Sequence, residues 1–301
     1  MRTVVLSLLA MMVLACESEI DVNLDESTPT LSVDAFINNM NQEQRIVLYF
    51  SQPYFENNMY EPATGASVVV TDITQGIDFT FEEKQDEPGI YRWVPPSEDE
   101  TFGSVGSSYS LTIDYDNVAY SASSAMSRVP TIDSIRFIES IGPQADDDDY
   151  QAEFFAIDFE GEGDSYWIKA YKNGDFLDEP AEINLAFDAG NSSGAAIDGD
   201  FFIVPVKLGI NPDDSDESYV FGDLVSVEIH SITNDTFDYM TELAIQTDNE
   251  GGFAQLFAAP PSNLRTNISS SDNNIRVLGH FSVSAVSGLE QEFTIDVLRI
   301  N

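Results

Sequence analysis

Apolar and polar residues alternate in short segments through the first third of the chain. From Leu31 the apolar positions fall at every second residue as far as Ile37, and similar short segments recur as far as residue 120. Such alternation predicts half-buried β-strands, and glycines between the segments supply the turns. Seven strands without a helical period indicate an antiparallel, Ig-like β-sandwich over residues 30–128. The segments are Leu31–Ile37, Ile46–Phe50, Val68–Val70, Phe79–Phe81, Ile90–Trp93, Tyr109–Ile113 and Val118–Tyr120.

A break follows at Val129-Pro130, because proline cannot join a central ladder and restricts the residue before it. The later pattern predicts a second β-rich domain over residues 129–301. Its expected strands are Ile132–Ile138, Glu153–Phe159, Tyr166–Tyr171, Ile183–Phe187, Phe201–Leu208, Leu224–Ile232, Ile275–Val286 and Glu292–Ile300. The fold class is therefore all-β, with two β-rich domains.

One short helix interrupts this second series of strands. Thr233 or Asn234 can cap its first turn, and Phe237 and Met240 recur on one face until Gln246. Two glycines follow a few residues later and stop the helical pattern.

The first sixteen residues predict export and lipid anchoring. Met1-Arg2 is a short positive region, and Val4–Leu14 is an almost unbroken apolar run that is too short to span a bilayer of ~30 Å. It ends in Val13-Leu14-Ala15-Cys16, which resembles a bacterial lipobox. We therefore expect a signal peptide over residues 1–15, a lipid on Cys16, and a polar tether over residues 16–29. An ordinary secretory signal is the alternative interpretation.

Composition narrows the classes of partner. The net charge is −41, which repels nucleic-acid phosphates and excludes nucleic acid as a partner. Cys16 is the only cysteine in the sequence, so lipidation leaves no thiol for a disulfide or a cysteine metal site. We expect no cofactor apart from the covalent lipid.

No catalytic set can be assembled from the sequence. Gly190–Gly194 fits the G-x-S-x-G pattern of hydrolases, but its surroundings lack the helical period that a nucleophile elbow needs. The acidic runs Asp146–Asp149 and Asp213–Glu217 carry oxygen donors that suit Ca²⁺, yet neither has the spacing of an EF-hand. We therefore assign no catalytic residue and no metal ligand, and interpret both acidic runs as solvated loops.

An apolar loop is the best candidate for contact with a partner. Residues 53–62 join two predicted strands and contain Tyr54, Phe55, Met59 and Tyr60, where a loop is normally polar. Aromatic residues and methionine are enriched at the centres of protein interfaces. These four residues form the predicted partner-binding surface, and capping of the end of the sandwich is the alternative role.

Several motifs follow one another along the chain in a recognisable order. They are Ser51-Gln52-Pro53-Tyr54, Gly65–Asp72, Gly89-Ile90-Tyr91, Tyr109–Ile113, Val129–Ile135, Pro260-Pro261, Thr266-Asn267-Ile268 and Leu278–Ser282. Together with Cys16 and its acidic tether, they resemble Bacteroidota lipoproteins of domain-of-unknown-function family 4249. The first domain also resembles transthyretin-like sandwiches. Genes of that family commonly lie beside TonB-dependent outer-membrane receptors, so the resemblance implies an accessory subunit with no established reaction.

These observations predict a lipid-anchored outer-membrane protein that faces the cell exterior. We expect it to be a non-enzymatic binding subunit of a TonB-dependent receptor complex. A cell-surface hydrolase or glycan-processing enzyme is one alternative. A stand-alone glycan-binding or adhesive module is another.

Overall fold

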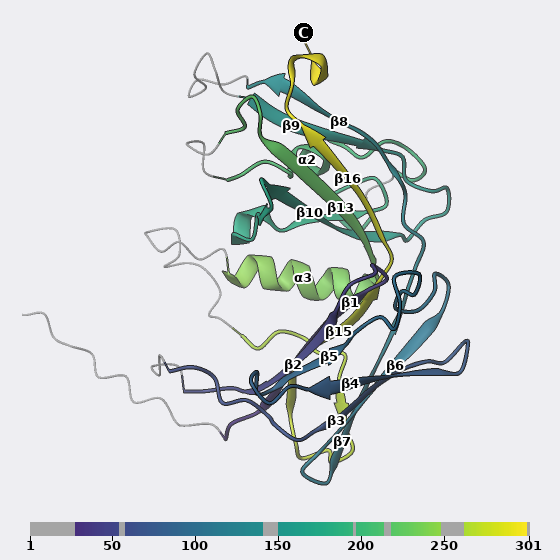
Figure 1. The fold of residues 1–301 in the computed structure, drawn as a ribbon, viewed down its shortest axis with the longest axis vertical. Helices are drawn as coiled ribbons and strands as arrows, with labels where there is room; N and C mark the ends of the chain where they lie inside the picture. The colour runs from purple at the N-terminus through teal and green to yellow at the C-terminus, as the bar shows by residue number, and fades with distance from the viewer. Residues whose placement is uncertain are drawn as a thin grey trace, which may run out of the picture.

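Strands from both ends of the chain form a nine-stranded sheet, which makes up the lower part of the molecule in Figure 1. The computed structural model describes residues 28–53, 58–140, 150–194, 197–213, 218–247 and 262–299. The strand order in this sheet is β14-β7-β6-β3-β4-β5-β2-β1-β15. The strands are β1 (Leu31–Asn38), β2 (Gln44–Phe50), β3 (Ser67–Asp72), β4 (Ile77–Glu83), β5 (Ile90–Trp93), β6 (Ser108–Tyr115), β7 (Val118–Ala125), β14 (Ser269–Ser270) and β15 (Val277–Ser284).

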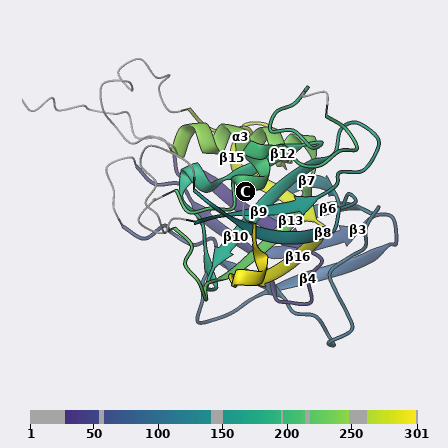
Figure 2. The same ribbon diagram turned by 90° about the horizontal axis from the view of Figure 1, so that it is seen from above.

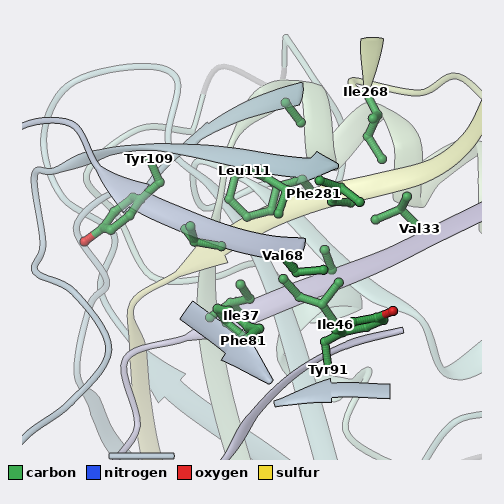
Figure 3. Close-up of a cluster of buried hydrophobic side chains, with 14 of the residues drawn as sticks. Val33, Ile37, Ile46, Val68, Phe81, Tyr91, Tyr109, Leu111, Ile268 and Phe281 are labelled. Atoms are coloured by element: carbon green, nitrogen blue, oxygen red, sulfur yellow. The ribbon is translucent and has the colours of Figure 1, made fainter. Parts of the chain in front are cut away.

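Alternation along each strand puts one face of this sheet in a common core. In β6, for example, Tyr109, Leu111 and Ile113 are fully buried, while the residues between them point outward. Figure 3 shows Leu111 near Val68 of β3 and Phe281 of β15 in the same apolar core. Residues far apart in sequence therefore share one hydrophobic core.

The sheet curls until its two ends nearly meet. At one end β15 pairs in parallel with β1, from Leu31 opposite Val277 to Asn38 opposite Ser284. Across the remaining gap, the backbone N–H of Val283 donates to Oγ of Ser124 in β7, at 3.1 Å. The result is a nearly closed barrel, which leaves few unpaired strand edges.

The upper part of the molecule contains two smaller sheets and most of the helical residues. A five-stranded sheet has the order β11-β10-β13-β16, with β12 also paired to β10, and a three-stranded sheet has the order β17-β8-β9. Seen from above, β8, β9, β13 and β16 lie over the barrel (Figure 2). The elements are β8 (Ile132–Glu139), β9 (Tyr150–Ala156), β10 (Ser165–Lys172), β11 (Asp175–Phe176), η1 (Pro180–Glu182), β12 (Asn184–Phe187), α2 (Val204–Leu208), β13 (Leu224–Ile232), α3 (Asn234–Thr247), β16 (Val286–Glu292), η4 (Ile295–Val297) and β17 (Leu298–Arg299).

A hydrogen-bonded seam connects the barrel to the upper sheets. The backbone of Ser231 at the end of β13 donates to the carbonyl of Ala285, at 2.9 Å, and the Ala285 N–H donates to Oγ of Ser231, at 3.0 Å. The same hydroxyl donates to the carbonyl of Ser127, at 2.9 Å. Since Ala285 links β15 directly to β16, the chain passes from one core to the other at this point.

The all-β class expected from the sequence is confirmed. The expected sandwich would consist of two separate sheets packed face to face. Instead, the N-terminal strands all belong to one curled sheet, and its core is formed where this sheet packs against itself. The predicted helix is confirmed as α3, and Thr233 is its cap, since Thr233 Oγ1 accepts a hydrogen bond from the N–H of Thr236 at 3.2 Å. None of the helices in the described ranges is long and apolar enough to cross a bilayer.

The strand expected over Phe201–Leu208 is wrong. Phe201 makes only an isolated bridge with Ile157, and Val204–Leu208 forms the short helix α2. Pro205 explains the difference, because it lacks the N–H that a ladder needs and has a backbone angle that suits the first turn of a helix.

The C-terminal strands also depart from the expected pattern. Residues 269–270 and 277–284 fall within the expected second domain, yet they form β14 and β15 of the barrel. The strand expected over Glu292–Ile300 is replaced, over the residues described, by the end of β16, the 3₁₀ turn η4 and the two-residue strand β17. A strand's own sequence does not identify its partner, because pairing depends on which edge is free in the folded sheet.

Candidate functional site

A pocket of about 280 Å³ lies where the barrel, the upper sheet and α3 meet. Strand β1 contributes Asp34 and Phe36, β10 contributes Trp167, and α3 contributes Tyr239 and Leu243. Pockets of this kind, with apolar walls and a few polar groups, are typical of sites for small ligands.

Aromatic rings form much of the pocket wall. The ring centroids of Phe36 and Trp167 are 5.8 Å apart with an interplanar angle of 74°, the edge-to-face arrangement that ring quadrupoles favour. Tyr239 stacks on His280 of β15, with centroids 4.5 Å apart and planes at 20°. These contacts hold the rings in fixed orientations, so the wall is organised before any ligand arrives.

Asp34 lines the pocket, and the oppositely charged Lys169 lies next to the lining residue Trp167. The Lys169 ammonium lies 3.9 Å from the centroid of the Trp167 ring, a cation–π contact. Burial lowers the pKa of Lys169, while the carboxylates of Glu228 and Asp34 act in the opposite direction. Loss of hydration inside the pocket raises the pKa of Asp34, while the positive charges of Arg45 and Lys169 lower it.

A buried histidine supports the carboxylate behind Lys169. Nε2 of His230 lies 2.8 Å from Oε2 of Glu228, and the Tyr171 hydroxyl donates to the same oxygen at 3.3 Å. Burial lowers the pKa of His230 to about 4, so the ring is neutral at pH 7 and donates from Nε2. Burial raises the pKa of Glu228. The hydrogen bond from His230 and the positive charge of Lys169 lower it by more, so the pKa of Glu228 is below its usual value.

His280 forms the second buried polar group. Its Nε2 lies 3.0 Å from Oγ1 of Thr236, which also donates to Oγ of Ser282 at 3.4 Å. Nδ1 has no hydrogen-bond partner among the described residues. Thr236 and His280 are both fully buried, so this hydroxyl–imidazole pair cannot reach a substrate and positions α3 against β15.

The family assignment comes from comparison with known proteins. A family model described as "Domain of unknown function (DUF4249)" matches residues 17–289. The chain belongs to this family. No curated protein matches it. The description of DUF4249 names no activity, so the function of this DUF4249 protein has to be argued from its own residues.

The structure describes only part of the partner surface expected in this DUF4249 protein. Met59 and Tyr60 are exposed over 96% and 58% of their surfaces, and the Tyr60 ring centroid lies 5.1 Å from that of Tyr49 in β2. Tyr54 and Phe55 lie outside the described residues, as does the expected lipid attachment at Cys16.

The hydrolase-like motif of this DUF4249 protein lies on a surface turn. Ser192 is exposed after β12, and the described residues 197–203 that follow are not helical. The Nε2 atoms of both histidines contact other partners, Glu228 and Thr236.

A group of carboxylates that could hold a metal ion lies at a place that the sequence analysis missed. The run 146–149 and residues 214–217 lie outside the described part of the chain, and the N–H of Asp213 donates to Oε1 of Glu182 at 3.0 Å. Instead, one carboxylate oxygen from each of Asp158, Asp188 and Asp198 lies within 4.8 Å of the other two. The sequence signal was the glycine-rich acidic stretch at residues 158–164, where a tight loop can bring backbone groups to an acidic side chain.

Proposed function

We propose that this protein is a lipid-anchored, non-enzymatic binding subunit at the exterior of the outer membrane, and that it works with a TonB-dependent receptor. The anchor is supported by Cys16, the single cysteine of the chain, placed after an apolar run. The receptor role is supported by the resemblance of the chain to lipoproteins whose genes lie beside such receptors.

The observation that carries this proposal is the exposure of Met59. Its side chain is exposed over 96% of its surface, the largest value for a bulky apolar residue in the described ranges, and Tyr60 follows it. An exposed apolar side chain gains free energy when a partner removes it from water. Tyr60 also packs on Tyr49, so this part of the loop is held against β2 in a defined position.

Affinity purification from gently solubilised outer membranes tests the proposal. The wild-type chain should co-purify a TonB-dependent receptor. The double variant Met59→Ser with Tyr60→Ala should bind the receptor about 30-fold more weakly, a loss of ~2 kcal/mol, as expected for residues at the centre of an interface. Ile245→Ser is the matched control, because Ile245 is 71% exposed but lies on α3. Equal recovery of receptor with all three chains would argue against this loop as the interface, and absence of any receptor would argue against the function.

The pocket favours one second candidate, a glycan-binding module. Aromatic faces of the kind supplied by Phe36 and Trp167 stack on the apolar faces of sugar rings, and carboxylates such as Asp34 accept hydrogen bonds from sugar hydroxyls. Glycan-array binding by the purified chain tests this idea. Trp167→Ala should abolish retention of any glycan bound by the wild-type chain, without a requirement for the receptor.

A further inference from the structure

Two loops of the upper part of the molecule are joined through carboxylates. The first loop connects β9 to β10 and begins near Asp158, and the second follows β12 and contains Asp188 and Asp198. Asp188 takes a left-handed backbone angle, φ 49°, which sharply turns the chain as it leaves β12. One carboxylate oxygen from each residue lies within 4.8 Å of the other two, so three acidic groups meet at this junction.

Backbone N–H groups orient two of these carboxylates. Oδ1 of Asp188 accepts hydrogen bonds from the N–H groups of Gly163, at 2.7 Å, and Asp164, at 3.0 Å. The two oxygens of Asp198 accept from the N–H of Gly161, at 2.9 and 3.1 Å. These bonds fix the carboxylates in place, but neutral amides do not cancel their negative charge.

Asp158 is as deeply buried as Asp188, and it differs from the other two because one of its carboxylate oxygens is buried without a hydrogen-bond partner. Its side chain is 3% exposed, and Oδ1 accepts a hydrogen bond from the Tyr166 hydroxyl at 2.6 Å. Oδ2 is buried and has no hydrogen-bond partner among the described residues. A buried carboxylate oxygen without a partner is destabilising, so this atom marks a position where a ligand would be favourable.

In the described part of the chain, no cationic side chain forms an ion pair with any of the three carboxylates, although the charge of Arg128 acts on Asp158. Arg128 forms its ion pair with Asp164, at 2.6 Å, and its remaining hydrogen bonds go to the carbonyls of Glu160 and Gly161. The arginine therefore closes the outer side of the first loop. The three-carboxylate cluster therefore has no ion-pair partner among the described residues.

We infer that Asp158, Asp188 and Asp198 form a binding site for one Ca²⁺ ion. Oxygen ligands alone suit a hard cation, and two oxygens bound to Ca²⁺ at ~2.4 Å are at most ~4.8 Å apart, which agrees with the cluster. Mg²⁺ requires shorter bonds and near-ideal octahedral geometry, so it fits less well. The ion would satisfy Oδ2 of Asp158 and hold the two loops together. This inference does not depend on the proposed receptor role.

Calorimetric titration of the full chain with CaCl₂, after treatment with a chelator, tests the site. The titration should run in ~0.15 M NaCl, which screens diffuse attraction to a surface of net charge −41. We expect one Ca²⁺ per chain with a Kd of ~10⁻⁴–10⁻³ M or tighter, the range of extracellular modules. The Tm should rise by about 3 °C at ten times the Kd, and MgCl₂ should have a smaller effect.

Two variants and a matched control make the result specific. Asp158→Asn and Asp198→Asn should each weaken Ca²⁺ binding at least tenfold. Asp86→Asn, which removes the same charge from an exposed turn of the barrel, should leave it unchanged. Asp198 is exposed, so its variant keeps the test valid if Asp158→Asn does not fold. Unchanged affinity in either folded variant, or an equal response to Mg²⁺ and Ca²⁺ in all chains, would overturn the inference in favour of diffuse binding to the acidic surface.

Discussion

Gly279 of β15 approaches Val33 of β1 so closely that a Cβ atom on Gly279 would lie 1.9 Å from the Val33 carbonyl oxygen. Gly279 also has a φ of 93°, a left-handed angle that side chains rarely adopt. The parallel pairing of the two strands, in which these residues are partners, therefore depends on the absence of a side chain here.

The first prediction follows from this contact. Gly279→Ala should lower the free energy of unfolding by at least ~3 kcal/mol, because it adds a steric clash to the backbone strain. Gly76→Ala is the matched control, since Gly76 has a φ of 70° but open space around its Cβ position. Its cost should be ~1–2 kcal/mol. Urea denaturation of both variants measures the difference, and equal losses would show that the β1–β15 contact relaxes at little cost.

A second prediction concerns the buried carboxylate that anchors α2. Glu153 in β9 accepts from Lys207 of α2 at 2.7 Å and from Arg299 at 3.2 Å. Lys207→Met should destabilise the fold by ~3 kcal/mol, because it leaves a buried charge poorly compensated. Arg299→Met should cost less than ~1 kcal/mol, since that side chain is 54% exposed and its ion pair is screened by water. Denaturation midpoints in urea compare the two, and a larger loss for Arg299→Met would reverse the assignment of the main partner.

The third prediction concerns pH. Burial lowers the pKa of His280 from 6.5 to about 4, while Asp235 raises it and Arg265 lowers it. The unfolded chain therefore binds a proton that the folded chain does not bind between these two values. His280 favours the folded state above pH 6.5, and this contribution is lost as the pH falls from 6.5 towards 4.

The test is a comparison with His280→Gln, which cannot titrate. Relative to this variant, the wild-type chain should lose up to ~3 kcal/mol of unfolding free energy between pH 7 and pH 4. Changes in the large acidic surface charge affect both chains and cancel in the difference. A difference that stays constant with pH would show that His280 is protonated normally in the folded protein.

The fourth prediction concerns the proposed anchor. Cys16→Ala should move the protein from the membrane fraction to the soluble fraction and abolish labelling by a clickable palmitate, because no other cysteine is present. Cys16→Ser serves as a closely matched second variant. Labelling that persists in both would place the lipid elsewhere or exclude it.

The sequence predicted the local structure better than the long-range structure. Alternation identified strands such as β6 and β13, and the cap at Thr233 identified α3, because these signals depend on neighbouring residues. Pro205 argues against a strand over 201–208, but the apolar residues around it resemble a strand, so the sequence did not predict the helix α2.

The sites could not be predicted because they are assembled by the fold. The pocket combines Asp34, Trp167 and Tyr239, which lie on three separate elements. The cluster of Asp158, Asp188 and Asp198 is selected from 53 acidic residues by loop geometry alone. By contrast, the unusual character of Met59 is visible in the sequence, because an apolar side chain in a predicted loop is unusual on its own, and the structure shows that this side chain is exposed.

The pairing of β1 with β15 also determines when the protein can fold during biosynthesis. Strand β1 emerges early from the ribosome, but its parallel partner ends at Ser284, close to the end of the described chain. The barrel therefore has an unpaired edge until residues 277–284 have been synthesised. A truncated product that lacks residues 277–284 keeps this edge exposed, which makes it prone to association with other chains and a good substrate for quality-control proteases.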